Sequence, residues 1–320
     1  MRSVPTVATS VVISRWARFA LPTLRLIESL MVSVTTLPKS SAAGARTPAD
    51  AGILVVDDIV KQFDTLEGPL LAVDHVSLSV RPGEFLAVIG PSGCGKSTLF
   101  NVIGGLLDGY QGAVTVGGET VRGPHPAIGM VFQEESTFPW RTVIENVAFP
   151  LEIAGMRKTD RLDKAKKFIA LVGLSGFENR YPAELSGGMR QRVAIARTLA
   201  SEPKILLMDE PFASLDEQTR LLLGDKVLQI QQDLKQTTLL ITHNITEAVQ
   251  LADRILVMTY RPGRVKRIVA IDLPRPRSSN VVSSEAFGRY VAQIWSDLRE
   301  EASRGMQDEE TRVLHAGEAT

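Results

Sequence analysis

The stretch Phe85–Thr98, FLAVIGPSGCGKST, joins a continuous apolar run to a glycine-rich loop. The run Phe85–Ile89 is typical of a strand that a sheet buries on both faces. The loop Gly90–Ser97 matches the pattern G-x-x-x-x-G-K-S, in which glycines let backbone N–H groups surround phosphate groups. Because the loop follows a predicted strand and precedes a predicted helix, whose N-terminal dipole favours anions, we expect a phosphate-binding turn.

Two side chains of this loop carry the predicted chemistry. Lys96 is expected to pair with the β- and γ-phosphates of a nucleotide, and the Ser97 hydroxyl to bind Mg²⁺. Cys94 could act as a redox switch, but we favour a loop position at which the type of side chain is of little consequence. The predicted nucleotide contacts in the loop are Gly90, Pro91, Ser92, Gly93, Cys94, Gly95, Lys96, Ser97 and Thr98.

The composition limits the kind of protein this can be. A chain of 320 residues with 44% hydrophobic content can bury one large core. Its formal net charge is zero, so the basic footprint of a nucleic-acid-binding protein is missing. A single cysteine excludes an internal disulfide framework and fits a reducing compartment. No apolar run reaches the roughly 18 residues of a membrane helix, so we expect any membrane role to depend on docking to a partner.

Apolar runs separated by helical segments predict an α/β layered fold. The run Ile205–Met208 resembles Phe85–Ile89, and the turn Pro82-Gly83 separates two earlier predicted strands. The other predicted strands are Ile53–Val56, Val73–Val80, Thr238–Thr242 and Ile255–Met258.

A helical subdomain of about residues 141–200 is predicted as an insertion in this α/β core. Within it, one helix is expected to begin at a Thr159 cap and to end at Gly173. Four apolar residues share a face of that helix by their spacing: Leu162, Ala165, Ile169 and Val172.

The two ends of the chain differ from the main domain, which we place at 51–275. Residues 1–50 are basic, with no acidic residue before Glu28, and end in a linker over 37–50. We favour a disordered extension or an early start, with Met31 as the true start, over a targeting peptide or a membrane-surface helix. At the other end, 276–320, the prolines of Leu273–Arg277 precede an amphipathic helix and a polar tail from Met306 that we expect to be disordered. The apolar face of that helix consists of Phe287, Tyr290, Val291, Ile294, Trp295 and Leu298.

Polar residues stand directly after two of the apolar strands. Asp209 and Glu210 follow Ile205–Met208, and His243 follows the next strand. Carboxylates beside a phosphate loop suit a bound cation and an attacking water, so Asp209 is predicted to contact Mg²⁺ and Glu210 to activate water. His243 is predicted to contact the γ-phosphate, because ligands collect at strand ends.

Together these motifs resemble the ATP-binding subunit of ABC transporters over about Ile53–Ile271. The further matching elements are Gln133 in VFQE, the motif LSGG at Leu185–Gly188, and Ser214-Leu215-Asp216 after the catalytic glutamate. The resemblance implies a phosphate-loop NTPase core of ABC ATPase type, ATP and Mg²⁺ as ligands, and two subunits that close head to tail on shared ATP.

The resemblance also implies roles for single positions. Phe63 would stack on adenine, and Gln133 would touch Mg²⁺ and sense the membrane partner. Asp216 would join the two sites across the dimer. Met189 departs from the glutamine often found at the fifth signature position, which leaves a side-chain contact to the opposite ribose unsupported. The signature residues facing the ATP of the opposite subunit would be Leu185, Ser186, Gly187 and Gly188.

A finer resemblance, to importers of nitrate, taurine and aliphatic sulfonates, rests on Thr137–Val143, TFPWRTV, and on Leu273–Arg277. It implies membrane permease subunits and a substrate-binding protein as partners, no nucleic acid, and a peripheral location at the cytoplasmic face of the membrane. Phe138 and Trp140 would form the docking surface, unless Trp140 belongs to the core. The C-terminal helix would pack on its own domain or bind a regulator. The alternatives are a soluble ABC-type ATPase of DNA repair or translation, and an exporter motor.

Overall fold

The computed structural model describes residues 53–318 except 67 and 135, and describes side chains up to residue 305. All of these residues belong to one compact unit, Asp50–Thr320. The predictions for residues 1–50, including the Met31 start and the linker over 37–50, lie outside the described residues. No helix in the described part is both long and apolar enough to cross a membrane.

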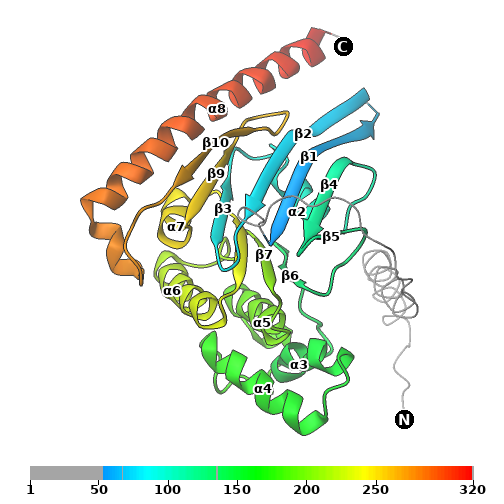
Figure 1. Cartoon of the computed structure of the whole chain (residues 1–320), viewed down its shortest axis with the longest axis vertical. Coiled ribbons are helices and arrows are strands. Elements are labelled where there is room, and N and C mark those ends of the chain that lie inside the picture. Colours follow the sequence, from blue (N-terminus) through cyan, green and yellow to red (C-terminus); the bar gives the residue numbers. More distant parts are fainter. Residues whose placement is uncertain (1–52, 67, 135, 319–320) are drawn as a thin grey trace, which may run out of the picture. The chain divides into compact units, whose positions relative to one another are not determined.

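A six-stranded sheet forms the centre of the fold, with the strand order β10-β9-β3-β8-β7-β6 (Figure 1). β6, β7, β8, β3 and β9 pair in parallel, and β10 pairs antiparallel to β9. The strands span Phe85–Ile89 (β3), Ile128–Val131 (β6), Ile205–Asp209 (β7), Thr237–Ile241 (β8), Arg254–Met258 (β9) and Val265–Ala270 (β10). The four buried strands predicted from apolar runs in this sheet are therefore confirmed to within one residue.

The central strand β3 divides the hydrophobic core in two. Phe85, Ala87 and Ile89 belong to a cluster that includes the helices on one side of the sheet. Leu86 and Val88 belong to a second cluster on the other side. Because every residue of β3 is fully buried, the strand's carboxyl end, where the glycine loop begins, is rigidly placed.

A second, antiparallel sheet of four strands covers the second cluster, in the order β2-β1-β4-β5. The predicted strands Ile53–Val56 and Val73–Val80 are confirmed, but both are much longer in the structure. Their outer parts are mostly exposed or half-exposed, and their pairing carries irregularities in register, which hid them from a search for apolar runs. The strands are Leu54–Thr65 (β1), Gly68–Val80 (β2), Gln111–Val116 (β4) and Glu119–Thr120 (β5).

The helices lie on both sides of the central sheet and at one end of it (Figure 1). α2 begins directly after the glycine loop and packs into the second cluster. α3, α4 and α5 contact one another and form the helical region at the end of the sheet. The helices span Lys96–Ile103 (α2), Val143–Ile153 (α3), Lys158–Leu171 (α4), Gly187–Ala200 (α5), Glu217–Leu234 (α6), Ile245–Leu251 (α7) and Glu285–Glu318 (α8), with 3-10 turns at Pro182–Glu184 and Ser279–Ser283.

The predicted apolar face of α4 is confirmed, but its predicted cap is wrong. Ala165, Ile169 and Val172 are buried. Thr159 lies inside the helix, whose N-cap is Arg157, and the Thr159 hydroxyl donates to Asp160 instead of capping the backbone. Gly173 follows the last turn with a φ of 69°, as expected of a helix-ending glycine.

The C-terminal helix α8 packs on the domain but differs from its prediction in two respects. Phe287 and Ile294 are buried in the first cluster, whereas Trp295 is 60% exposed and lies off the packed face. The tail from Met306 is not disordered, because α8 continues to Glu318. Eight of the fifteen residues from Met306 are Glu, Ala, Gln, Arg or Leu, which favour helix by intrinsic propensity.

Candidate functional site

The glycine loop has the shape that its motif predicts. It connects β3 to α2, and Gly95 forms the N-cap of α2 with a left-handed φ of 98°. A Cβ atom at Gly95 would lie 2.5 Å from the carbonyl oxygen of Ala72 on β2, so only glycine fits there. Lys96 Nζ donates to the carbonyl oxygens of Gly90 and Pro91, both at 2.8 Å, and is buried against the loop.

Cys94 is not a position of free choice. Its side chain is fully buried in the second cluster, and a Cβ at Gly90 would lie 2.8 Å from its sulfur. Burial raises the pKa of the Cys94 thiol, only partly opposed by Lys96. The loop therefore folds this side chain into the core beneath it, where a small apolar group is required and a reactive thiolate is disfavoured.

A cavity of about 410 Å³ lies over the loop. It is lined by Phe63, Leu70, Ala72, Ser92, Gly93, Gly95, Lys96, Ser97, Thr98, Gln133, Glu210 and Arg261. The structure thus brings Phe63, the loop, Gln133 and Glu210 to one place. Lys61 Nζ lies 5.0 Å from the centre of the Phe63 ring, so one ring face packs on the protein.

Glu210 contacts two other predicted site residues, His243 and Gln133. Its backbone has a left-handed φ of 46°, and its N–H donates to Ile241 O on the neighbouring strand at 2.9 Å. Its Oε2 lies 3.0 Å from His243 Nδ1 and accepts from Gln133 Nε2 at 3.5 Å. The strained backbone at this strand end turns the carboxylate toward the cavity, while the His243 side chain is largely exposed beside it.

Asp209 suits a cation. Its Oδ1 is buried, and no hydrogen-bond partner for this atom is found among the described residues. Burial raises the pKa of Asp209, and a hydrogen bond from Ser97 opposes that shift. A buried carboxylate oxygen without a hydrogen-bond donor is stabilised by a proton or a cation, so the donor set at this strand end fits the Mg²⁺ predicted from the sequence.

The signature segment lies at the start of another helix. Ser186 is the N-cap of α5, and its Oγ accepts from Met189 N at 3.3 Å. Leu185 is buried, whereas Gly187 and Gly188 are partly exposed in the first turn. Met189 packs on the first cluster, so its side chain serves the core. None of these residues lines the cavity described above.

Asp216 also caps a helix. Its Oδ1 accepts from Thr219 N at 2.9 Å at the start of α6. Hydrogen bonds from Thr219 lower the pKa of the Asp216 carboxyl. A Cβ at Gly188 would lie 2.6 Å from the Leu215 side chain, so the Ser214–Asp216 segment and the signature turn are direct neighbours.

Three cavity residues escaped the sequence reasoning: Leu70, Ala72 and Arg261. The first two belong to the outer part of β2, which was not predicted. Arg261 lies in the turn between β9 and β10, and its Nε donates to Gly93 O at 2.9 Å. The sequence signal for it was the turn Arg261-Pro262-Gly263 two residues after a predicted strand, at the sheet edge where ligands collect.

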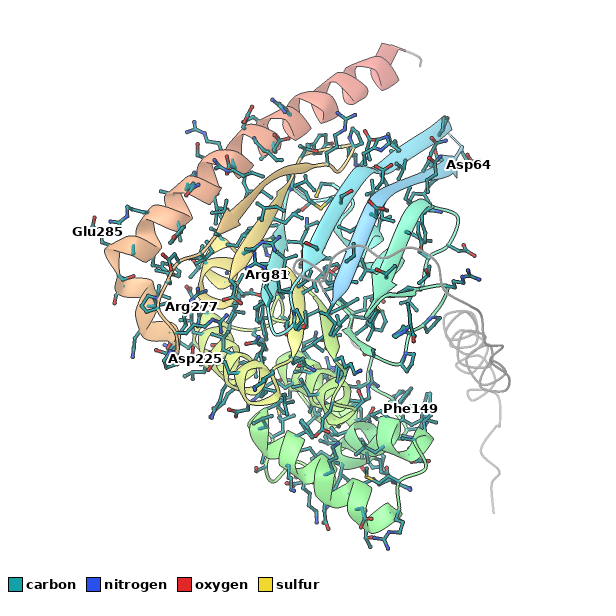
Figure 2. All side chains as sticks on the ribbon, viewed as in Figure 1. Asp64, Arg81, Phe149, Asp225, Arg277 and Glu285 are labelled. Atoms are coloured by element: carbon teal, nitrogen blue, oxygen red, sulfur yellow. The ribbon has the colours of Figure 1, made fainter. Side chains whose placement is uncertain are left out.

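Phe138 and Trp140 form an aromatic surface with Phe149 of α3, which is labelled in Figure 2. The ring centres of Phe138 and Phe149 are 4.7 Å apart, and those of Phe138 and Trp140 are 5.7 Å apart. Arg197 of α5 covers the Phe138 ring at 5.0 Å and donates to Ser136 O. Trp140 is 68% exposed, so the alternative that it belongs to the core is wrong.

Comparison with known proteins gives a consistent picture. The family model described as ABC transporter matches residues 73–213. An uncharacterized ABC transporter ATP-binding protein of Methanocaldococcus jannaschii is 48% identical over 79% of this chain and 94% of its own length. A nitrate import ATP-binding protein of Synechocystis is 41% identical over 82% of this chain and 98% of its own. An aliphatic sulfonates import ATP-binding protein of Bacillus licheniformis is 49% identical over 64% and 80%, respectively.

Two solved structures extend the comparison to three dimensions. A dimeric bacterial ABC transporter cassette shares 31% identity over 69% of this chain and all of its own, with a TM-score of 0.64. A post-hydrolysis state of an ATP-binding cassette bound to ADP and Pi matches over the same shares with a TM-score of 0.63.

Proposed function

Since the chain belongs to the ATP-binding proteins of ABC transporters, we propose that it hydrolyses ATP to drive uptake of a small anionic solute such as nitrate, taurine or an alkanesulfonate. The observation that carries the ATPase is the cavity that gathers Phe63, the glycine loop and Glu210. The names of two relatives, a nitrate and an aliphatic sulfonates import protein, support the direction of transport and the class of cargo. They disfavour DNA repair, translation and export.

The ATP would lie in the cavity with its adenine on the free face of Phe63. Its β- and γ-phosphates would replace Gly90 O and Pro91 O as partners of Lys96. The remaining contacts are proposed for the backbone and hydroxyl groups of Gly90–Thr98. Positive charge and N–H dipoles at the N-terminus of α2 then face the triphosphate.

The site becomes complete when a second copy of the chain joins it. Leu185–Gly188 lie outside the cavity of their own chain, and a solved relative is dimeric. In the proposed head-to-tail dimer, each ATP touches Lys96 of one copy and Ser186, Gly187 and Gly188 of the other. Asp216, next to the signature turn, would couple the two sites.

Hydrolysis would proceed by attack of water on the γ-phosphorus. The water oxygen bonds to phosphorus, its proton passes to Glu210, and the bond to the bridging β–γ oxygen breaks to give ADP and phosphate. His243 would contact the γ-phosphate, and its hydrogen bond with Glu210 orients the two groups. Ser97, Gln133 and Asp209 would hold Mg²⁺, which supplies positive charge to the phosphates.

Opening and closing of the dimer would be passed to membrane permease subunits. The surface of Phe138 and Trp140 follows Gln133 closely in the chain and offers the exposed apolar area that such docking needs. An extracytoplasmic substrate-binding protein would complete the system, and the chain would sit at the cytoplasmic face of the membrane without nucleic acid. We retain 51–275, with a helical part at about 141–200, as the proposed domain boundaries.

Replacing Glu210 with Gln tests the mechanism. Glutamine keeps the size of the side chain but cannot take the proton, so E210Q should bind ATP, hydrolyse it at least about 100-fold more slowly, and accumulate as an ATP-bound dimer. Phosphate release and size-exclusion chromatography with MgATP measure both. Normal hydrolysis by E210Q would show that the catalytic assignment is wrong. Uptake of nitrate, taurine and alkanesulfonates by a deletion strain identifies the cargo.

A further inference from the structure

The C-terminal helix α8 places a buried carboxylate against the turn that follows β9. Glu301 is 1% exposed, and its Oε2 accepts from the backbone N–H of Tyr260 at 2.9 Å. Its Oε1 accepts from Lys266 Nζ at 2.8 Å and from Arg304 at 3.3 Å. A buried carboxylate that accepts from this set of donors holds the Tyr260 backbone in one position.

The same turn, residues 259–264, touches both sides of the nucleotide cavity. Arg261 Nε donates to Gly93 O in the glycine loop at 2.9 Å. Gly263 N donates to Ala72 O on β2 at 3.1 Å, and Gly263 O accepts from Asp74 N at 3.0 Å. The turn therefore joins the phosphate-binding wall of the cavity to the β2 wall.

Two glycines bring the turn into close contact with its neighbours. A Cβ at Gly263 would lie 2.1 Å from Cys94 O, so the turn is packed directly beneath the glycine loop. On the other side, a Cβ at Gly305 of α8 would lie 2.9 Å from the Tyr260 ring. A glycine within a helix costs stability, and here it lets the aromatic ring lie against the helix backbone.

The contact between Arg261 and Gly93 bears on nucleotide binding. A carbonyl oxygen directed at a triphosphate would repel it, and the Arg261 guanidinium gives Gly93 O a cationic partner on the loop itself. A shift of the turn would release that carbonyl and loosen the loop around Lys96.

We infer that Glu301 is a positioning residue for the ATP site: it fixes the turn 259–264, through which Arg261 fixes the glycine loop, so that α8 sets the affinity for ATP. This inference rests on the proposed ATP site. It gives α8 a part in nucleotide binding, in addition to its packing on the domain.

The test measures the affinity of the full chain for a fluorescent trinitrophenyl derivative of ATP with Mg²⁺, in the wild type, Glu301→Ala and the matched control Glu300→Ala. Glu300 also pairs with Lys266 and Arg304 but is exposed, and among the described residues no contact joins it to the turn. We expect the dissociation constant to rise about fivefold in E301A and to change less than about twofold in E300A.

A double-mutant cycle separates positioning from a general loss of stability. Arg261→Ala should weaken binding by a similar factor, and the double variant E301A/R261A should bind about as R261A does, because both act through one contact. Gly305→Ala provides a second approach to α8, since alanine favours helix but displaces Tyr260. It should raise the dissociation constant without lowering the unfolding temperature.

Two results would overturn the inference: wild-type affinity in E301A, or full additivity of E301A and R261A. The variant Lys96→Ala tests the proposed ATP site independently of Glu301. If K96A binds as the wild type, the proposed ATP site is wrong. If K96A abolishes binding while E301A leaves it unchanged, only the positioning role of Glu301 is wrong.

Discussion

The glycine loop and the signature turn both stand at the N-terminus of a helix, but they differ in how their donors are used. α2 has no side-chain cap, so the N–H groups of its first turn are not taken by a capping side chain. α5 is capped by its own Ser186, whose Oγ already accepts from Met189 N. The first helix end therefore leaves its first-turn donors to an external acceptor, whereas the second already has one of them, the Met189 N–H, bonded within the chain.

The two regions also differ in what supports them. The loop grows out of a fully buried strand, and Lys96 is buried with its ammonium held by two carbonyls. The signature turn lies at the edge of the helical region, with Ser186 exposed. This difference predicts that ATP binds first and tightly to the loop, and that the signature turn of a second copy adds a smaller contribution.

Among the tests of this comparison, Lys96→Ala should have the largest effect on ATP binding. Removing a charge-assisted partner of two phosphates should weaken ATP binding on the order of 100-fold. Isothermal titration calorimetry of MgATP with the full chain measures the effect. Lys166→Ala, at an exposed lysine paired with Asp163 on α4, is the control and should bind as the wild type. Binding by K96A within a few-fold of the wild type would contradict the primary role of the loop.

A second test concerns Glu247, a buried residue that hydrogen-bonds to Thr242, next to His243. Glu247 on α7 is 7% exposed, and burial raises its pKa to about 8, against a hydrogen bond with Thr242 that lowers it. In the unfolded chain, a glutamate has its ordinary pKa of 4.5, so the folded protein keeps this proton at pH values where the unfolded chain has lost it. Glu247 therefore makes the free energy of unfolding fall as pH rises between the two values.

Glu247→Gln mimics the protonated acid and should remove that dependence. The stability of the wild type relative to E247Q should fall by about 1.4 kcal/mol, a factor of ten in the folding equilibrium, for each pH unit between about 5 and 8. Urea unfolding at several pH values measures the difference. Parallel curves for the two proteins would show that Glu247 is ionised in the folded state.

The sequence predicted the loop better than the site around it, for a physical reason. Phe85–Thr98 is a local pattern in which strand, turn and helix start are adjacent, so no distant contact is needed to interpret it. Arg261 reaches Gly93 from 168 residues further along the chain. Only the pairing of β9 with β3 brings it there, and periodicity carries no information about such pairing.

The errors follow from the same limit. Nothing in the sequence around Cys94 indicates that its side chain is buried. Its burial comes from the packing of the loop on the second cluster. Thr159 has the right side chain for a cap, but the chain enters α4 two residues earlier. The outer half of β2 was missed because its residues are half-exposed, so that neither an apolar run nor a clean alternation marks it.

The smallest expected effect concerns the signature turn, where substitutions of Ser186 distinguish a contact with ATP from a helix cap. Ser186→Ala should leave ATP binding to the single chain within about twofold, because Ser186 does not line the loop's cavity. In the E210Q background it should weaken ATP-dependent dimerisation about fivefold, by loss of one hydroxyl contact to phosphate.

Alanine also removes the helix cap, at a cost of about 1 kcal/mol, whereas glycine costs only a few tenths. Analytical ultracentrifugation with MgATP should therefore show the same loss for Ser186→Gly as for Ser186→Ala if the hydroxyl acts on ATP. If Ser186→Gly dimerises like its Ser186 parent while Ser186→Ala does not, the serine serves α5 alone, and the signature turn adds no hydroxyl to the shared site.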